Sequence, residues 1–384
     1  MTKERLGKYI QEYSVKNKTD LGYPVYSVTN SKGFCTEYFN KDVSGADKTT
    51  YKIVPRGFFA YNPSRINVGS IDWQNCEDNV IVSPLYVVFK CSDGLNQDYL
   101  KYYLKSDCGK RQINARVSGA VRNNLKFSVL SNFELEIGSI ENQQTAVKLL
   151  KKIEDALNHE IEQLRLCEEL VKSQYIEMFE SGQSFPRQSL VELCLDSDDI
   201  KCGPFGTQLK QSEYRSEGVA VWGIPQINTA FESKPDVFVT EEKAASLESY
   251  SIQSGDIAVS RKGNVGKCAV FPTGFDKGII ASDVVRIRLN KDLVHPVFMQ
   301  YQLHNSFMVK KQILDVSSGA IMAGINVTKL KNIKVCVPQL SLQKDFLLVV
   351  EQSDKLRKES QKRINLYKEL LSKKTDELFN GESA

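Results

Sequence analysis

The 384-residue sequence predicts an α+β protein made of two similar halves, in which a globular block precedes a long helix each time. Three observations support this prediction. Residues 130–179 align with residues 330–379 without a gap. Both segments carry apolar residues at helical spacing, and the regions before them are rich in short β-type runs between turn residues. The predicted segments are a first block at 1–140, a first helix at 141–182, a second block at 183–340 and a second helix at 341–380.

The internal repeat has a constant offset of 200 residues over most of its length. Its identities are Leu130, Asn132, Gln143, Leu166, Glu169, Leu170, Glu177 and Phe179 with Leu330, Asn332, Gln343, Leu366, Glu369, Leu370, Glu377 and Phe379. Upstream, Ser118-Gly119-Ala120 recurs as Ser318-Gly319-Ala320, whereas Asn67-Val68-Gly69 recurs as Asn264-Val265-Gly266, three residues out of step. A duplicated chain implies two similar surfaces in one molecule.

The first helix is expected over residues 141–180. Its apolar residues follow steps of three and four, at Leu150, Ile153, Leu157, Ile161, Leu164, Cys167, Val171, Tyr175 and Met178. The mean step is about 3.5, the period of a coiled coil. Ser139 fits an N-cap, and Gly182 and Pro186 follow the end of the pattern. Such a helix would be roughly 60 Å long.

The second helix repeats the pattern less regularly. Its stripe runs through Phe346, Val350, Leu356, Ile364, Tyr367, Leu371 and Leu378. Arg357 and Gln361 interrupt it where the first copy has Leu157 and Ile161. Two long helices, each apolar on one face, can bury those faces against each other. The periodicity alone allows either antiparallel or parallel packing.

The blocks before the helices are expected to be compact α+β domains. Examples of the expected strands are Ile81–Phe89, Val219–Ile224, Ile257–Ser260 and Val284–Leu289. Helical stretches are expected at residues 97–113 and 296–313, and residues 182–187 are the expected linker between the halves.

Composition excludes several classes of protein. No run of 18 apolar residues predicts a transmembrane helix, and no apolar region follows the charged start as in a signal peptide, so a cytoplasmic location is expected. The nine cysteines include no Cys-x-x-Cys pair, and the three histidines lack metal-ligand spacing. Reduced thiols and no metal site are expected.

The charge distribution favours nucleic acid as a partner of the blocks rather than the helices. Residues 1–140 carry 19 Lys+Arg against 14 Asp+Glu, and residues 186–340 carry 18 against 16. Residues 141–185 carry 5 against 9. The basic excess lies in the non-helical blocks, although variation around neutrality would explain charge differences of this size equally well.

Motifs of catalysis and of cofactor binding are absent from the sequence. There is no phosphate-binding Gly-x-x-x-x-Gly-Lys-Ser/Thr loop, no Gly-x-Ser-x-Gly elbow and no His-Glu-x-x-His helix. Gly203-Pro204-Phe205-Gly206 is expected to be a turn. Asp236 with Glu241 and Lys243 superficially matches a nuclease pattern that holds Mg²⁺, but a solvated turn and helix start is the better interpretation. We therefore expect no catalytic residue, no metal and no cofactor.

Two loops in each half are dense in groups that can contact bases and phosphates. The first loops are residues 61–70 and 260–267, and the second are residues 116–124 and 317–326. Arg and Lys can reach guanine O6/N7, and Asn can pair with adenine N6/N7. Ordinary turns with solvated charges are the alternative, but similar loops at matching places in both halves favour DNA binding. The candidate residues are Arg56, Asn62, Ser64, Arg65, Asn67, Arg116, Arg122, Asn123, Arg261, Lys262, Asn264, Lys267, Ser318 and Asn326.

On these motifs the chain resembles the DNA-specificity subunit of type I restriction–modification systems. The similar strings in the second half are Ser254-Gly255-Asp256-Ile257, the 260–267 loop, Ile325-Asn326 and Val337-Pro338. In the first half they are Tyr61–Ile66, Ser83–Tyr86 and Gly119–Arg122. The resemblance covers essentially the whole chain. It departs before each helix, where Gly138 and Asn142-Gln143, or Leu342-Gln343, replace the usual Pro and Glu-Gln.

The resemblance implies two target recognition domains that each read one half of a bipartite double-stranded DNA site. It implies that the long helices form an antiparallel coiled coil with pseudo-two-fold symmetry, which fixes the half-site spacing. Two methyltransferase subunits carrying S-adenosylmethionine would dock on the helices, ATP-dependent restriction subunits would join them, and the chain itself would catalyse nothing. A Mg²⁺-dependent nuclease and a coiled-coil scaffold that binds only proteins are the alternatives.

Overall fold

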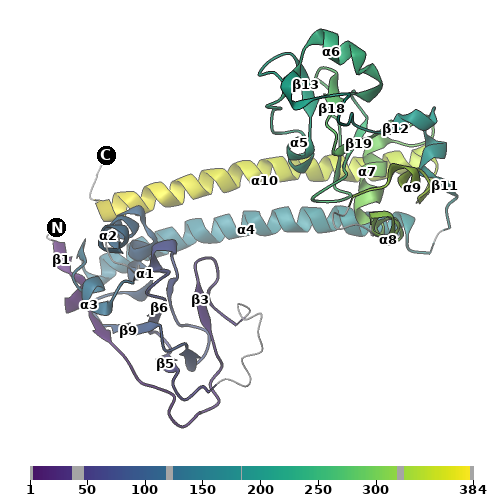
Figure 1. Ribbon diagram of the computed structural model, residues 1–384. Helices are drawn as coiled ribbons and strands as arrows, with labels where there is room; N and C mark the ends of the chain where they lie inside the picture. The colour runs from purple at the N-terminus through teal and green to yellow at the C-terminus, as the bar shows by residue number, and fades with distance from the viewer. Residues whose placement is uncertain (1–2, 37–46, 118–123, 183, 318–323, 381–384) are drawn as a thin grey trace. The chain divides into compact units, whose positions relative to one another are not determined.

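The structure, a computed structural model, describes residues 3–36, 47–117, 124–182, 184–317 and 324–380. It consists of two compact units. The first unit comprises residues 1–162 and 360–384, and the second comprises residues 163–359. The long helices α4 (Ile140–Phe179) and α10 (Leu340–Asn380) therefore each contribute a part to both units (Figure 1).

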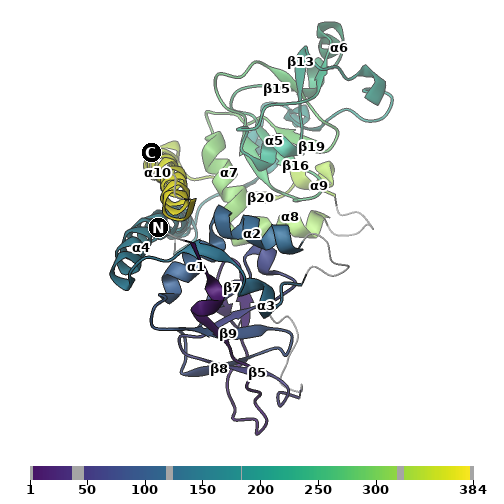
Figure 2. The same ribbon diagram turned by 90° about the vertical axis from the view of Figure 1, so that its left-hand side faces the viewer.

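The first unit is built around a four-stranded antiparallel sheet of order β2-β9-β6-β7. Helices α1 and α2 lie on one side of it, and the β5–β8 pair lies on the other (Figure 2). Its strands are β1 (Lys3–Arg5), β2 (Ile10–Glu12), β3 (Ser27–Thr29), β4 (Gly33–Cys35), β5 (Lys52–Pro55), β6 (Phe59–Tyr61), β7 (Ile71–Trp73), β8 (Asn79–Val82), β9 (Val87–Cys91) and β10 (Glu134–Glu136). Its short helices are α1 (Gln97–Lys105), α2 (Asp107–Val117) and α3 (Phe127–Leu130).

Alternation along the strands gives this unit a core on each side of the sheet. Phe59 and Phe89 stack with ring centroids 4.9 Å apart and pack with the residues of α1 and α2. Ala60 and Val88, one position away, pack with buried valines of β5 and β8. Successive side chains of a strand point to opposite faces, so this short sheet is covered on both sides.

The second unit repeats the central topology of the first. Its sheet has the order β12-β19-β16-β17, and β11 pairs with β20 as β1 pairs with β10. The strands are β11 (Arg187–Ser189), β12 (Ile200–Cys202), β13 (Val219–Trp222), β14 (Phe238–Val239), β15 (Ser251–Ile252), β16 (Ile257–Ser260), β17 (Cys268–Val270), β18 (Gly278–Ile280), β19 (Val284–Ile287) and β20 (Lys334–Cys336). The helices are α5 (Ile224–Asn228), α6 (Glu241–Ser246), α7 (Pro296–Asn305), α8 (Phe307–Ser317) and α9 (Val327–Lys331).

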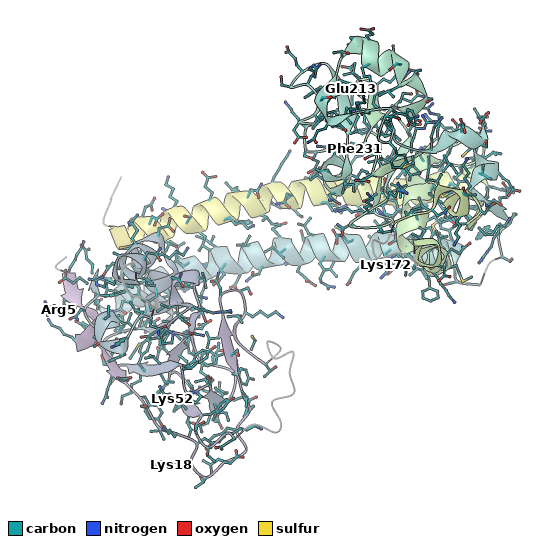
Figure 3. The ribbon with its side chains drawn as sticks, viewed as in Figure 1. Arg5, Lys18, Lys52, Lys172, Glu213 and Phe231 are labelled. Atoms are coloured by element: carbon teal, nitrogen blue, oxygen red, sulfur yellow. The ribbon has the colours of Figure 1, made fainter. Side chains whose placement is uncertain are left out.

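The two units differ in the elements added to this common centre. The second unit has another sheet, of order β14-β13-β18-β15, with its own buried aromatic cluster. Phe231 belongs to that cluster, whereas Glu213 lies in an exposed turn near α6 (Figure 3). The first unit has the β3–β4 and β5–β8 pairs instead. The repeat in the sequence thus corresponds to a shared centre and not to the whole of each unit.

Two predicted elements in the globular parts are interrupted. The predicted helices at 97–113 and 296–313 are each broken in two, at Ser106 and Ser306. The hydroxyl oxygen of Ser106 accepts from the Gly109 amide at 3.1 Å, and that of Ser306 accepts from the Val309 amide at 3.3 Å, so each serine caps the helix that follows. The predicted strand Ile81–Phe89 is two strands, β8 and β9, because Pro84 lies between them and lacks the amide that a central strand needs.

The long helices pack antiparallel within each unit. In the first unit Glu160 of α4 pairs with Arg363 of α10, and Val147 shares a core with Phe379. In the second unit Tyr175 of α4 contacts Phe346 of α10, with ring centroids 5.8 Å apart. Later residues of α4 thus meet earlier residues of α10 in both units. The contacts decide between the two packing modes that the periodicity left open.

The predicted apolar stripe of α4 is wrong at one position. Ile161 is 47% exposed, whereas its neighbour Glu160 is only 7% exposed. Glu160 accepts a hydrogen bond from Nε of Arg363 at 2.7 Å, and this contact lowers the pKa of the carboxyl group. Glu160 rather than Ile161 continues the heptad spacing of Ile153 and Leu157. The contact between the helices is polar at this point. A search for apolar residues at helical spacing therefore selected the adjacent Ile161 instead of Glu160.

A similar difference occurs on α10. Leu356, predicted in the stripe, is 51% exposed, and the buried positions of this segment are Ser353 and Ser360. The Ser353 hydroxyl donates to the Cys167 carbonyl at 3.2 Å, and Arg357 pairs with Glu168 of α4 at 3.3 Å. The interruption seen at Arg357 is therefore a polar part of the same helix contact.

A buried glutamine joins the start of each long helix to its globular part. Oε1 of Gln143 accepts from the Asn96 amide at 2.9 Å, and Nε2 donates to the carbonyls of Gly94 and Gly138 at 3.0 and 2.9 Å. Gln343 accepts from the His295 amide at 2.8 Å and donates to the carbonyls of Leu293 and Pro338 at 3.2 and 2.8 Å. Asn96 and His295 are the N-caps of α1 and α7. One side chain in each unit thus binds three backbone groups, two in the loop before α1 or α7 and one just before the long helix.

Replacing Gln143 with alanine should lower the free energy of unfolding by about 2–4 kcal/mol, because it leaves a buried amide and two carbonyls without their partner. Gln144→Ala is the matched control, since Gln144 is the same residue type on the exposed face of the helix. Urea unfolding of the full chain measures both. Equal stability of the two variants would contradict a linking role for Gln143.

Candidate nucleic-acid interface

The first predicted loop of each half is a hairpin turn at the same place in the common sheet. Residues 62–70 connect β6 to β7, and residues 261–267 connect β16 to β17. Each turn ends near a glycine with positive φ, +87° at Gly69 and +83° at Gly266. A Cβ on Gly69 would lie 2.2 Å from Oδ1 of Asn30, so only glycine fits there. The repeated Asn-Val-Gly thus lies near the end of two turns that take the same place in the sheet but have nine and seven residues.

Each hairpin turn is bonded to the segment that precedes α3 or α9. The Leu125 amide donates to the Pro63 carbonyl at 3.0 Å, and the Ile325 amide donates to the Arg261 carbonyl at 3.2 Å. A side chain returns the bond in both units. The Tyr61 hydroxyl donates to the Leu125 carbonyl at 3.0 Å, and Nε of Arg261 donates to the Ile325 carbonyl at 3.1 Å. The structure therefore places the first predicted loop of each half against Leu125 or Ile325, at the end of the second predicted loop.

In the first unit the turn presents an exposed arginine beside a locally ordered asparagine. Oδ1 of Asn62 accepts from the amide and hydroxyl of Ser64 at 3.1 and 2.8 Å, which shapes the turn. Ser64 and Arg65 are exposed, and Asn67 is half-buried. Arg65 is the positively charged side chain that this turn exposes.

Two other candidates of the first unit make their contacts with residues outside the turn. Arg56 precedes β6 and so lies at the opposite end of that strand, where it pairs with Asp78 at 3.7 Å and donates to the Asn75 carbonyl. Arg116 is exposed near the end of α2, with its guanidinium 4.8 Å from the Phe133 ring centroid. Arg122, Asn123 and Ser318 lie outside the described residues.

In the second unit Arg261 is held from three sides. Besides the bond to Ile325, its Nη1 lies 3.8 Å from Sγ of Cys202, and its guanidinium lies 5.1 Å from the Phe205 ring centroid. Burial raises the pKa of the Cys202 thiol, which donates to the Ser282 carbonyl at 3.2 Å. Arg261 is thus a fixed part of the loop framework, in the place that Tyr61 takes in the first unit.

The remaining candidates of the second unit surround this framework. Lys262 pairs with Asp283 at 3.0 Å, and Lys267 donates to the Asn228 carbonyl at 2.9 Å. Nδ2 of Asn264 lies 3.5 Å from Oδ1 of the same Asn228. Asn326 accepts from the Lys329 amide at 3.0 Å and caps α9. Lys262 and Asn264 are exposed, and Asn326 is exposed as well.

Sequence reasoning missed the residues that hold these candidates in place. Phe205, Asn228 and Asp283 are remote from the 261–267 turn in the chain and match no motif. Gly203-Pro204-Phe205-Gly206 was predicted only as a turn, but it carries the ring that faces Arg261. A Cβ on Gly203 would lie 2.1 Å from the Ala281 carbonyl oxygen, so the glycine permits the close approach of this loop. Gly203 and the aromatic residue Phe205 were the two features of the sequence that could have indicated this contact.

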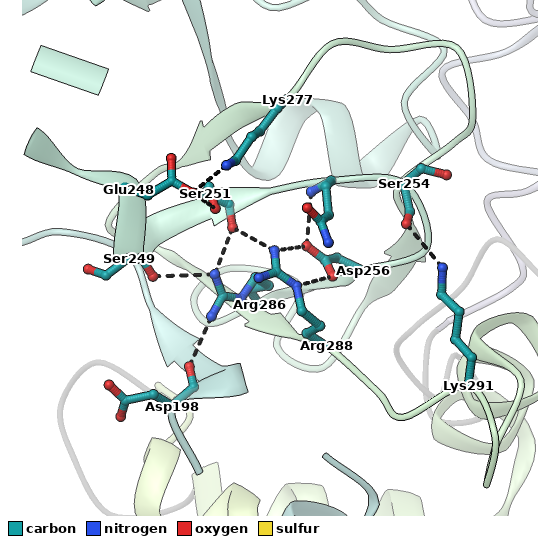
Figure 4. A network of polar contacts seen from close by, with 11 residues as sticks. Asp198, Glu248, Ser249, Ser251, Ser254, Asp256, Lys277, Arg286, Arg288 and Lys291 are labelled. Atoms are coloured by element: carbon teal, nitrogen blue, oxygen red, sulfur yellow. Dashed lines mark hydrogen bonds and ion pairs between the residues drawn. The ribbon is translucent and has the colours of Figure 1, made fainter. Parts of the chain in front are cut away.

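A buried charge network supports the sheet that carries this turn (Figure 4). Asp256, which is 2% exposed, accepts from Nε and Nη2 of Arg288 at 2.8 and 2.7 Å, and this pairing raises the pKa of Arg288. Arg286, which is 4% exposed, donates to the carbonyls of Asp198 and Ser251 at 2.9 and 2.7 Å. Asp256 belongs to the Ser-Gly-Asp-Ile string noted in the sequence, and its role here is to fix neighbouring strands.

The chemistry of the alternatives has little support in the described residues. No group of three or more His, Cys, Asp or Glu side chains in them is arranged to hold a metal ion. Lys243 of the nuclease-like string pairs with Glu213 at 2.8 Å, and Thr240 caps the helix that begins at Glu241, as expected of a solvated helix start. Within the same residues no helix has both the length and the apolarity needed to cross a membrane.

Comparison with protein families matches a type I restriction modification DNA specificity domain twice, at residues 6–165 and 204–366. The chain belongs to this family. A curated relative, a putative type I restriction enzyme MjaX specificity subunit of Methanocaldococcus jannaschii, is 26% identical over 141 residues. That alignment covers 35% of this chain and 33% of the relative, so the chain spans about a third of the length of the curated specificity subunit that it matches.

Solved structures agree with this family's fold. A chain from a study of complex assembly and conformational transition of the type I R-M system has a TM-score of 0.62 at 15% identity, covering 98% of this chain and 96% of that one. The S subunit of a type I restriction–modification system from M. genitalium has a TM-score of 0.58 at 15% identity, with the same coverage. The α+β specificity fold with long paired helices, predicted from the sequence, is confirmed.

Replacing Asp256 with asparagine should lower the free energy of unfolding by about 3 kcal/mol, because the half-buried guanidinium of Arg288 loses its carboxylate partner and the buried Arg286 loses a nearby negative charge. The control is Asp276→Asn, since Asp276 is an exposed aspartate of the same unit. Urea unfolding followed by circular dichroism measures the difference. A D256N variant as stable as D276N would show that the network does not support the sheet.

Proposed function

We propose that the chain is the non-catalytic DNA-recognition subunit of a type I restriction–modification complex, in which each unit reads one half of a bipartite double-stranded DNA target. The observation that carries this proposal is the repeated recognition surface. A hairpin turn rich in Arg, Lys and Asn is bonded in each unit to the segment before α3 or α9. The family match supports DNA as the ligand.

The chemistry of the turns suits the groups exposed in the major groove. Arg65 in the first unit and Lys262 in the second are exposed cations, and Asn264 offers an amide that can pair with adenine. The framework behind them is bonded to the backbone, as with Arg261 and Ile325. Side chains on such a framework lose little conformational entropy when they bind.

The two half-sites should have different sequences. The first turn offers Asn62, Ser64 and Arg65, whereas the second offers Lys262, Asn264 and Lys267. Direct readout depends on which donors and acceptors meet each base edge. Two surfaces with the same support but different side chains therefore recognise unlike sequences at two places.

The long helices are proposed to set the spacing between the half-sites. Recognition domains at residues 1–140 and 183–340 would then be separated by spacer helices at 141–182 and 341–380. An uninterrupted helix transmits length at about 1.5 Å per residue. The buried glutamines Gln143 and Gln343 support this role, because they fix each helix to the domain that precedes it.

The exposed faces of the helices suit protein partners. Leu149 and Leu366 of the first unit are 48% and 60% exposed, and Leu166, Leu170 and Leu348 of the second are 49%, 53% and 58% exposed. Exposed apolar residues on a helix favour association with another protein. Duplication of the helix sequence favours two equal sites, and we assign them to two methyltransferase subunits, with ATP-dependent restriction subunits joining that assembly in the cytoplasm.

Substitutions of the exposed cations test DNA recognition by the two units separately. Arg65→Ala should weaken binding of the methyltransferase-bound complex to its target duplex by about tenfold or more, since a base contact contributes about 1–3 kcal/mol. Sequence selection from a randomised duplex should then relax in the first half-site alone, whereas Lys262→Ala should affect the second half-site. Methylome mapping in cells with and without the gene supplies the target.

The matched control for the Arg65→Ala variant is Arg5→Ala. Arg5 is an exposed arginine of the same unit, on strand β1 (Figure 3), where its Nε lies 4.0 Å from a carboxylate oxygen of Glu134. It should leave affinity and sequence preference unchanged. If a single half-site of arbitrary sequence bound the wild-type complex as tightly as the full target at moderate salt, sequence recognition by this subunit would be wrong.

Lengthening both helices should change the preferred distance between half-sites. One added heptad in each of 145–175 and 345–375 preserves the seam and lengthens each helix by about 10 Å. That length corresponds to about three base pairs of B-DNA. Binding to duplexes with varied spacers measures the optimum, and replacing an existing heptad by another of equal length is the control. An unchanged optimum would contradict the spacer role.

A further inference from the structure

We propose that a cleft beside the second recognition turn reads the major-groove edge of a thymine, through the Nδ1–H donor of His304 and the apolar wall of Leu314 and Ile313. The cleft has a volume of about 460 Å³ and lies between the 265–267 end of the turn and helices α7 and α8. This inference rests on the proposed function, because it assumes that the turn faces DNA.

The hydrogen bonds of His304 define which nitrogen is available. Nε2 accepts from the Cys268 amide at 3.0 Å, so it carries no proton. Desolvation and the nearby Lys310 and Lys267 lower the pKa of this imidazole, which keeps the ring neutral. The proton is then on Nδ1. Nδ1–H has no hydrogen-bond acceptor among the described residues, and His304 lines the cleft.

The rest of the cleft is apolar with cations at its edge. Leu303 and Ile313 are 3% and 6% exposed, and Leu314 is 64% exposed at the opening. Lys267 and Lys310 also line the cleft. Ammonium groups next to an apolar surface suit a ligand whose phosphates lie beside an apolar edge, as they do in DNA.

Thymine is the base whose edge matches this combination. In the major groove it presents an acceptor, O4, next to the apolar C5-methyl group. Cytosine presents an amino donor at the position of O4, which would face the imidazole donor. Adenine and guanine have no methyl group for the apolar wall. The cleft is continuous with the recognition turn through Val265, Gly266 and Lys267, so a base near the turn can reach it.

The first unit lacks this combination. At the offset of 200, Leu104 replaces His304 and Asn114 replaces Leu314, whereas Lys110 and Ile113 correspond to Lys310 and Ile313. Leu104 is buried and offers no donor. The thymine contact should therefore exist in one half-site only.

Deoxyuridine substitution tests the proposal with the wild-type protein. Each thymine of the target is replaced singly by deoxyuridine, which removes only the methyl group, and binding to the methyltransferase-bound complex is measured by fluorescence anisotropy. One position in the second half-site should show an affinity loss of about fourfold, the equivalent of one buried methyl group. In the Leu314→Ala variant, the ratio of the affinities for thymine and deoxyuridine at that position should fall to near one.

Leu195→Ala is the matched control, because Leu195 is an exposed leucine of the same unit that does not line the cleft, and it should retain the difference. If the wild-type complex binds its target specifically but no thymine of the second half-site is sensitive, the thymine contact is wrong and the recognition function stands. The thymine contact is equally wrong if Leu314→Ala retains the full difference. If the complex shows no sequence-specific binding, the recognition function fails, and this inference fails with it.

Discussion

The structure depends on the attachment of each long helix to the domain before it. A buried amide side chain, Gln143 or Gln343, contributes to that attachment by bonding to three backbone groups at once. A buried amide has a strict direction, since its oxygen must accept and its nitrogen must donate. The start of the helix, the N-cap of α1 or α7 and the loop before that cap are therefore held in one arrangement.

The contact between the helices combines apolar and polar layers. Tyr175, Phe179 and Phe346 form an aromatic cluster in the second unit, whereas the buried Glu160 pairs with the half-buried Arg363 in the first. Polar groups in a helix seam often specify register, because a shift would leave a buried charge without its partner. The buried Ser353 donates to the Cys167 carbonyl of α4, and the buried Ser360 accepts from Nη2 of Arg363 at 3.2 Å. Apolar layers thus supply most of the association, and the polar layers supply its register.

The architecture could be predicted from the sequence because helical periodicity can be recognised within a short segment of the chain. Steps of three and four residues identify α4 and α10, and the offset of 200 identifies the duplication. The same rule failed at Ile161, because it cannot recognise a charged residue whose partner, Arg363, is about two hundred residues away in the chain. Phe205 with Arg261 and Asp256 with Arg288 are long-range pairs of the same kind. His304 had no metal-like spacing, and its role follows only from the bond to the Cys268 amide. Candidate loops were therefore found, but the groups that orient them were not.

The common sheet with its variable additions has a consequence for how such proteins diversify. Both globular parts share two connections to the start of the helix that follows, the β1–β10 or β11–β20 pair and the buried glutamine. The β13–β18 sheet of one part and the β3–β4 hairpin of the other lie outside those connections. Those added elements can accordingly change in sequence and length without altering either of the two connections.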